Sequence, residues 1–147
     1  MEAMKEITFN KGQIVFCQGE NASVMYDIIS GKIGIYTDYQ TDKENKIAEL
    51  EAGEVFGEMG LIEYWPRSAT AVALEDGTVV TELGEDDLKE YLKDKPEKLL
   101  TVMRQLSRRI RETTQNYVSV CRTVNENRRT QEELDKYAAL YTTYWMN

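Results

Sequence analysis

The sequence predicts a mainly β fold with helices: an antiparallel barrel or sandwich up to residue 84, then helices that end in one long C-terminal helix. Two observations predict this division. All nine glycines lie at or before Gly84, and in that part short runs rich in β-branched and aromatic residues lie between glycine or polar turns. After it, apolar residues recur at helical spacing. We therefore expect a first domain of residues 1–95 and a second segment, residues 96–147, with a long helix and an aromatic-rich helical tail.

Seven short runs are predicted to be strands: ITF, QIVFCQ, VMYDIIS, KIGIYTDY, KIAEL, SATAVAL and TVVTEL. Strands so short and so closely spaced favour an antiparallel arrangement over βαβ units. Alternation of apolar and polar residues in KIGIYTDY and TVVTEL indicates one buried and one solvated face. The segment TDYQTDKENK is predicted to be a polar loop between two of these strands.

Two helices are predicted after the strands. EDDLKEYLKD forms a short helix with acidic residues in its first turn, and Pro96 suits the first turn of the next helix. In this second helix, apolar residues follow alternating steps of four and three, which is a heptad pattern. The pattern starts with Leu99, Met103, Leu106, Ile110, Thr113, Tyr117, Val120 and Val124.

The heptad stripe has two interpretations. It covers the core of its own barrel, or it pairs with a second copy of the chain. Residues 99–124 span about 40 Å at about 1.5 Å per residue, which is longer than a barrel of so few residues is tall. This length favours a homodimer through residues 99–124. Polar Asn127 and Gln131 interrupt the stripe, and we expect the helix to bend or end there.

The composition excludes several classes of protein. The chain has no histidine, and its two cysteines, Cys17 and Cys121, stand apart. No histidine triad, His-ligated zinc site or disulfide framework is therefore expected, and no catalytic cofactor or metal. No apolar run approaches about 18 residues, and the start lacks a signal-peptide pattern. We expect a cytoplasmic protein that is not an enzyme and has no membrane partner.

The net charge of −8 is unevenly distributed. Residues 1–97 carry 21 acidic and 9 basic side chains, whereas residues 98–129 carry 8 basic and 2 acidic ones. An acidic protein repels nucleic acid at long range, so only the basic stretch could bind it. The alternative is that these charges line a solvated helix surface.

One segment, FGEMGLIEYWPRSATAVA, concentrates residues that suit an anionic ligand. Gly57 and Gly60 flank one turn of helix-compatible residues, and a helix start offers unpaired N–H groups to an anion. Arg67 is the only cation of residues 47–88. It either neutralises an acidic surface or binds an anionic ligand. Glu58 can accept hydrogen bonds from a diol while Arg67 clamps a phosphate, which is the chemistry that a ribose cyclic phosphate requires.

The same segment resembles the phosphate-binding cassette of cyclic nucleotide-binding domains, with its F-G-E, short helix and P-R-S-A core. Upstream, FNKGQIVFCQGENASVMYDIISGKIGIY resembles the first half of the β-roll of that family, so the resemblance covers residues 7–92. It implies an antiparallel β-roll of the double-stranded β-helix or jelly-roll type. It also implies roles for the cassette residues: Glu58 binds the ribose 2′-hydroxyl, Arg67 binds the exocyclic phosphate oxygens, and Gly57, Met59 and Ser68 line the phosphate.

The long helix is similar to the central helix of the cyclic-AMP receptor protein family, through SRRIRETTQNYVSV. In that family the helix forms the dimer, and two adjacent hydroxyls contact the adenine, one from each subunit. Thr113 and Thr114 match these positions. Arg109 matches an arginine that can pair with the ribose-binding carboxylate, here Glu58. Without the resemblance, two threonines on a helix are ordinary surface or seam residues.

Two departures from the family bear on function. Tyr64 and Trp65 precede Pro66 where small residues are usual, which predicts a reshaped loop or an added stacking ring. Only 20 residues follow Asn127, too few for three helices of about 11 residues with their turns. Sequence-specific DNA binding is therefore not expected. The tail YAALYTTYWMN is predicted to be an apolar helix face, with the β-roll, the nucleotide or a partner subunit as its neighbour.

Together with the residue patterns, the resemblance implies a sensor that binds a cyclic nucleotide, cAMP first and cGMP as the second choice, and transmits its occupancy to the dimer helix. Ser68 is compatible with either purine. One alternative is a structural dimerisation module with an unoccupied pocket. Another is a nucleotide-cleaving enzyme, which the missing histidines and metal-ligand spacings disfavour. We expect Arg67 in a surface cleft, so that Arg67→Ala removes binding and leaves the fold intact.

Overall fold

The computed structural model describes the backbone of residues 4–145 and the side chains of residues 4–140. The chain divides between Met103 and Arg104 into two compact units, each of which is described by itself. The first unit contains the strands, α1, α2 and the beginning of α3, and the second contains the remainder of α3. The expected boundary after residue 95 lies before this division: α3 starts at Pro96, and its first residues belong to the first unit.

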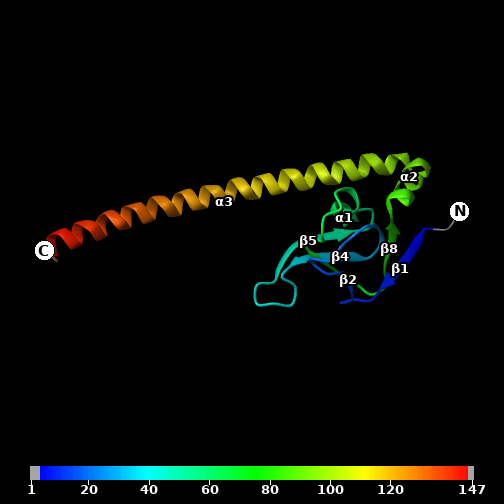
Figure 1. Ribbon diagram of the computed structural model, residues 1–147, viewed down its shortest axis with the longest axis horizontal. Helices are drawn as coiled ribbons and strands as arrows, with labels where there is room; N and C mark the ends of the chain where they lie inside the picture. The colour runs from blue at the N-terminus through cyan, green and yellow to red at the C-terminus, as the bar shows by residue number, and fades with distance from the viewer. Residues whose placement is uncertain (1–3, 146–147) are drawn as a thin grey trace. The chain divides into compact units, whose positions relative to one another are not determined.

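Strands and long helices separate along the sequence as predicted. Their order is β1 (Lys5–Phe9), β2 (Ile14–Phe16), β3 (Met25–Ser30), β4 (Lys32–Thr37), β5 (Asn45–Glu51), β6 (Val55–Phe56), α1 (Glu58–Ile62), β7 (Thr70–Ala73), β8 (Thr78–Leu83), α2 (Glu85–Asp94) and α3 (Pro96–Trp145). Figure 1 shows α2 directly after β8 and α3 as one continuous helix.

The strands form two four-stranded sheets, in the orders β1-β8-β3-β6 and β2-β7-β4-β5. Every pair is antiparallel, and strands far apart in the sequence lie side by side, β1 with β8 and β2 with β7. Two antiparallel sheets with such long-range pairs form a jelly roll. The predicted antiparallel β-roll with flanking helices and a long C-terminal helix is confirmed.

Two clusters of buried apolar side chains hold the first unit together. One is formed by residues of both sheets: Phe16, Tyr26, Ile28, Ile33, Leu50, Phe56, Ala71, Ala73 and Val80. The other joins β3, β6 and β8 to the helices: Met25, Val55, Leu61, Leu83 and Tyr91, with Met4, Leu88 and Val102 at its edge. Because Leu61, Tyr91 and Val102 come from three different helices, this second cluster attaches α1, α2 and the beginning of α3 to one sheet.

One turn shows why glycine separates the strands. Gly31 alone lies between β3 and β4, and its φ is 85°. A Cβ atom at this position would lie 2.3 Å from the Thr78 Oγ1 atom. The positive φ and the close approach together require glycine at this turn.

One strand was missed by the sequence pattern. β6 has two residues, and it pairs with β3 through Phe56 opposite Tyr26 and Val55 opposite Asp27. Two residues are too few to show the alternation of apolar and polar side chains by which a strand is predicted. The predicted polar loop is also shorter than expected, since the first residue of TDYQTDKENK belongs to β4 and Asn45 already begins β5.

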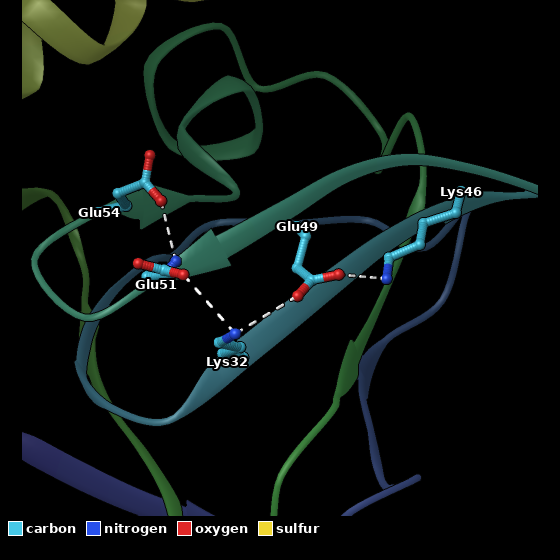
Figure 2. Close-up of polar contacts among 5 residues, drawn as sticks. All are labelled: Lys32, Lys46, Glu49, Glu51 and Glu54. Atoms are coloured by element: carbon cyan, nitrogen blue, oxygen red, sulfur yellow. Dashed lines mark hydrogen bonds and ion pairs between the residues drawn. The ribbon is translucent and has the colours of Figure 1, made fainter.

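A row of charges covers the pair β4–β5. Figure 2 shows Lys32 between Glu49 and Glu51, with Nζ to carboxylate oxygen distances of 3.7 Å to each. Lys46 donates a hydrogen bond to Glu49 and thereby lowers the pKa of that carboxyl. Glu54 accepts a hydrogen bond of 2.8 Å from the Glu51 backbone N–H. Because β5 is an edge strand, these charges disfavour pairing with a strand of another molecule.

The long helix differs from the expectation at its polar positions. α3 runs without interruption from Pro96 to Trp145, through both Asn127 and Gln131. Of the expected bend or end, the end was wrong, because Asn and Gln lower helix propensity by only tenths of a kcal/mol, whereas Gly and Pro, which are absent from these positions, break helices. The bend stays a prediction. The aromatic tail begins with Tyr137, which is exposed, while the side chains of residues 141–147 lie outside the described residues.

Most of the heptad stripe of α3 is exposed in the isolated chain, with Leu106 half-buried. Ile110 is 67% exposed, and Tyr117, Val120 and Val124 are exposed as well. An apolar stripe of this length needs a covering surface. Among the described residues, none of the helices combines the length and the apolar character needed to cross a lipid bilayer.

Candidate functional site

The predicted cassette begins where β6 meets α1. Gly57 caps the N-terminus of α1 with a φ of 75°, a left-handed conformation that favours glycine. A Cβ atom on Gly57 would lie 2.6 Å from Arg67 Nη1, and one on Gly60 would lie 2.4 Å from the Ala22 Cβ atom. The spacing of the two glycines is therefore a packing requirement of the short helix α1 and its neighbours.

Arg67 lies at the centre of the cassette, and it is 7% exposed. Its Nη1 donates to the Gly57 carbonyl oxygen at 2.9 Å, and its Nη2 donates to the Val24 carbonyl oxygen at 3.0 Å. The guanidinium carbon lies 4.0 Å from the centroid of the Phe16 ring, which adds a cation–π contact. The sequence led us to expect Arg67 in a surface cleft, whereas in the structure its side chain is buried and contacts two backbone oxygens and the Phe16 ring.

The burial of Arg67 has an electrostatic consequence. Burial lowers the pKa of the guanidinium, while Tyr26, Glu20 and Glu58 favour its charged form. An arginine guanidinium stays protonated in proteins even when it is buried. The cassette therefore holds a permanent positive charge within an acidic region of the chain.

The backbone beside Arg67 is also fixed. Its N–H donates to the Glu20 carbonyl oxygen at 2.9 Å, and its carbonyl oxygen accepts from the Gly19 N–H at 2.8 Å. The turn between β2 and β3 is thus hydrogen-bonded to the backbone of Arg67. Nearby, the Gln18 N–H donates to Thr70 Oγ1 at 2.9 Å, which joins the same turn to the first residue of β7.

The other predicted cassette residues surround Arg67. Glu58 is half-buried at the start of α1, next to Gly57. Met59 follows it and is exposed, and the Ser68 hydroxyl lies 3.8 Å from the Met59 sulfur. Gly57, Glu58, Met59, Arg67 and Ser68 are therefore brought together by β6, α1 and the loop before β7.

The two threonines predicted to contact a base lie on α3 in the second unit. Thr113 and Thr114 are both exposed. The Thr114 hydroxyl donates to the Ile110 carbonyl oxygen at 2.8 Å, a bond within the helix. Their approach to a nucleotide and the pairing of Arg109 with Glu58 stay predictions.

The cassette loop contains the two aromatic residues that depart from the family pattern. Tyr64 has a φ of 53°, which is unusual for a residue with a side chain. Its hydroxyl donates to the Glu85 carboxylate at 2.8 Å, so the loop is tied to the first residue of α2. Trp65 is exposed beside it. The loop is therefore held by a contact to α2.

Sequence reasoning missed the residues that hold Arg67. Phe16 and Val24 lie 51 and 43 positions before Arg67 in the sequence. No sequence motif links either residue to Arg67. It also missed a surface hollow of about 490 Å³. Its lining residues are Ile14, Cys17, Gln18, Gly19, Asp38, Tyr39, Gln40 and Thr70, none of which is a predicted ligand-binding residue.

The comparison with known families identifies the family to which the first part of the chain belongs. The cyclic nucleotide-binding domain matches residues 6–95 of this chain. The chain belongs to that family. This cyclic nucleotide-binding domain is also 30% identical, over 113 residues, to a CRP-like cAMP-activated global transcriptional regulator of Mycobacterium tuberculosis. The alignment covers 77% of this chain and 50% of the regulator, so the chain spans about half the length of this relative.

Solved structures agree with the assignment. The catabolite activator protein of Thermus thermophilus superposes on this cyclic nucleotide-binding domain with a TM-score of 0.62 and 32% identity, covering 75% of this chain and 51% of the other. A c-di-GMP-responsive global regulator of Xanthomonas campestris superposes with a TM-score of 0.64 and 26% identity, covering 76% of this chain and 56% of the other.

Within the part of the chain that the structure describes, no group of three or more His, Cys, Asp or Glu side chains could hold a metal ion.

Proposed function

We propose that this cyclic nucleotide-binding domain is a cAMP sensor that transmits its occupancy to α3 in a homodimer. The observation that carries the proposal is Arg67, a permanently charged side chain held inside the cassette by two carbonyl oxygens and the Phe16 ring. A cation fixed in this way is prepared for an anionic ligand at little cost in side-chain entropy.

The cassette residues receive distinct roles in this proposal. Arg67 binds the exocyclic oxygens of the cyclic phosphate, because a guanidinium forms parallel charged hydrogen bonds with a phosphate. Glu58 accepts a hydrogen bond from the ribose 2′-hydroxyl. Gly57, Met59 and Ser68 line the phosphate, and the glycine allows the backbone to approach it closely.

The purine is contacted by residues outside the cassette. Thr113 and Thr114 supply hydroxyls to the adenine, one of them from the partner subunit. We place cAMP before cGMP because the Mycobacterium tuberculosis relative is named as cAMP-activated. The Xanthomonas campestris relative is named as responsive to c-di-GMP, which makes this cyclic dinucleotide a ligand to compare.

The homodimer forms through residues 99–124 of α3. The exposed apolar stripe supports this, since Ile110, Tyr117, Val120 and Val124 recur at heptad spacing. A pocket completed by both subunits would tie cAMP affinity to dimerisation, because linkage is reciprocal. The domain then acts by shifting a population between two arrangements of α3.

The alternative function is a structural dimer whose cassette stays empty. Isothermal titration of the full chain with cAMP, cGMP and c-di-GMP separates the two. The sensor predicts saturable binding of cAMP with one site per chain and weaker binding of the other two nucleotides. An absence of binding by all three would favour the structural dimer. A parallel assay for AMP tests nucleotide cleavage, and the sensor predicts none.

A further inference from the structure

β3 contains a buried charge that the cassette does not use. Asp27 interrupts the apolar run VMYDII, and its side chain is 3% exposed. Its Oδ1 lies 2.8 Å from the Lys98 ammonium, and its Oδ2 accepts a hydrogen bond from the Tyr91 hydroxyl. Among the described residues Oδ1 has no other donor, so Lys98 compensates its charge. A buried ion pair is expensive to desolvate, and removal of one partner leaves the other charge uncompensated in the interior.

The three residues come from three different elements of the first unit. Asp27 lies on β3, Tyr91 on α2, and Lys98 in the first turn of α3. Lys98 also donates to the Gly53 carbonyl oxygen at 2.7 Å, in the turn just before β6. We call Asp27, Tyr91 and Lys98 the polar anchor. It ties the beginning of α3 to the strand pair β3–β6.

The same strand segment also contacts the cassette arginine. The Val24 carbonyl oxygen accepts from Arg67 Nη2 at 3.0 Å, and the Tyr26 ring lies 5.7 Å from the guanidinium carbon. Successive side chains of a strand point to opposite faces, so Tyr26 faces Arg67 while Asp27 faces α2 and α3. Residues 24–27 therefore contact Arg67, the residue predicted to bind the phosphate, through Val24 and Tyr26, and they contact the start of α3 through Asp27.

We propose that the polar anchor is the coupling element of this domain: residues 24–27 connect Arg67 to Asp27, and the Asp27–Lys98 pair fixes the first turn of α3. The ligand part of this inference rests on the proposed function. A phosphate bound at Arg67 attracts a guanidinium whose Nη2 also donates to the Val24 carbonyl oxygen. A movement of the guanidinium therefore displaces residues 24–27, and because a buried ion pair is either made or broken, the displacement reaches α3 as a discrete change.

The first experiment measures the anchor without ligand. Hydrogen exchange of the backbone amides of residues 99–103 is compared among the wild-type chain, Lys98→Met, the double variant Asp27→Asn/Lys98→Met, and the control Lys93→Met. Lys93 is an exposed lysine on α2. Lys98→Met is expected to raise exchange by about 100-fold or more, since it leaves a buried carboxylate unpaired. The double variant removes both charges, so it keeps the fold testable if Lys98→Met unfolds.

In the double variant the amides of residues 99–103 are expected to exchange faster, while those of β4 and β7, in the other sheet, keep their wild-type rates. The Lys93→Met control is expected to match the wild-type chain throughout. Wild-type exchange at residues 99–103 in the double variant would overturn the anchor, because α3 would then be held without it.

The second experiment repeats the exchange with saturating cAMP and measures cAMP affinity by titration. In the wild-type chain cAMP is expected to change exchange at residues 99–103 by about fivefold or more, the lower end of usual coupling. The double variant should bind cAMP within about fivefold of the wild-type affinity, because linkage lets the lost coupling change the affinity by about that factor, and it should lose the change in exchange. An undiminished change in the double variant, or a loss of binding, would overturn the coupling role. If the wild-type chain failed to bind cAMP, the proposed function would fall while the first experiment would still decide the anchor.

Discussion

Replacing Arg67 by alanine is expected to weaken both nucleotide binding and the fold. The side chain donates to the Gly57 and Val24 carbonyl oxygens and lies over the Phe16 ring. Hydrogen bonds to charged groups contribute about 1.5–3 kcal/mol each, so the loss of two costs about 3–6 kcal/mol in free energy of unfolding. Domains of this size are stable by about 5–15 kcal/mol, so the variant folds at low temperature with a reduced margin.

The expected loss of binding follows from the same donors. Two charged hydrogen bonds to the phosphate, at about 1.5–3 kcal/mol each, correspond to a loss of cAMP affinity of at least about 100-fold. Isothermal titration gives the affinity, and urea unfolding followed by circular dichroism gives the stability. Lys43→Ala is the matched control, because it removes one positive charge from an exposed loop outside the cassette. It should leave both quantities unchanged.

Arg67→Lys separates charge from geometry. A lysine keeps the positive charge, but it lacks the planar fork that reaches two acceptors at once. It should recover part of the stability and only a small part of the affinity. Unchanged cAMP affinity in a folded Arg67→Ala protein would refute the assignment of Arg67 to the phosphate, and unchanged stability would refute the structural role of its two carbonyl contacts.

Three further predictions concern the ribose, the dimer and the purine. Glu58→Ala should weaken cAMP less than Arg67→Ala does and leave 2′-deoxy-cAMP unaffected, which titration with both ligands checks; equal losses for both would contradict the ribose role. Ile110→Glu should give monomers in sedimentation, because like charges would face each other across the two-fold axis; a stable dimer would place the interface elsewhere. Thr114→Val should keep the dimer, cost about 0.5–1.5 kcal/mol of cAMP binding and narrow the preference over cGMP; an unchanged preference would remove Thr114 from the site.

The sequence predicted those elements whose own residues mark them, by periodicity or by end signals. α2 begins and ends at Glu85 and Asp94 as predicted, because its acidic first turn and its following proline mark both ends. β6 escaped prediction because it exists only through its pairing with β3. The continuation of α3 past Asn127 escaped prediction because the polar residues interrupt the apolar stripe without disrupting the backbone.

The cassette was predictable as a set of residues, and its environment was not. Gly57, Glu58 and Arg67 are close in the sequence and share a motif, so the sequence indicated them together. The burial of Arg67 depends on Phe16 and Val24, which reach it only after the sheets have formed. Asp27 did carry a signal, a carboxylate within an apolar strand, but its partner Lys98 lies 71 residues further along the chain.

Sedimentation of the full chain with and without cAMP tests the central claim most directly, because a sensor must pass occupancy to its dimer helix. If each pocket is completed by Thr114 of a second chain, cAMP tightens dimerisation by the factor by which dimerisation tightens cAMP. The account predicts a dimer dissociation constant that falls at least about fivefold with saturating cAMP, the lower end of usual coupling. A dimer constant indifferent to cAMP would contradict it, since each pocket would then be complete within one chain.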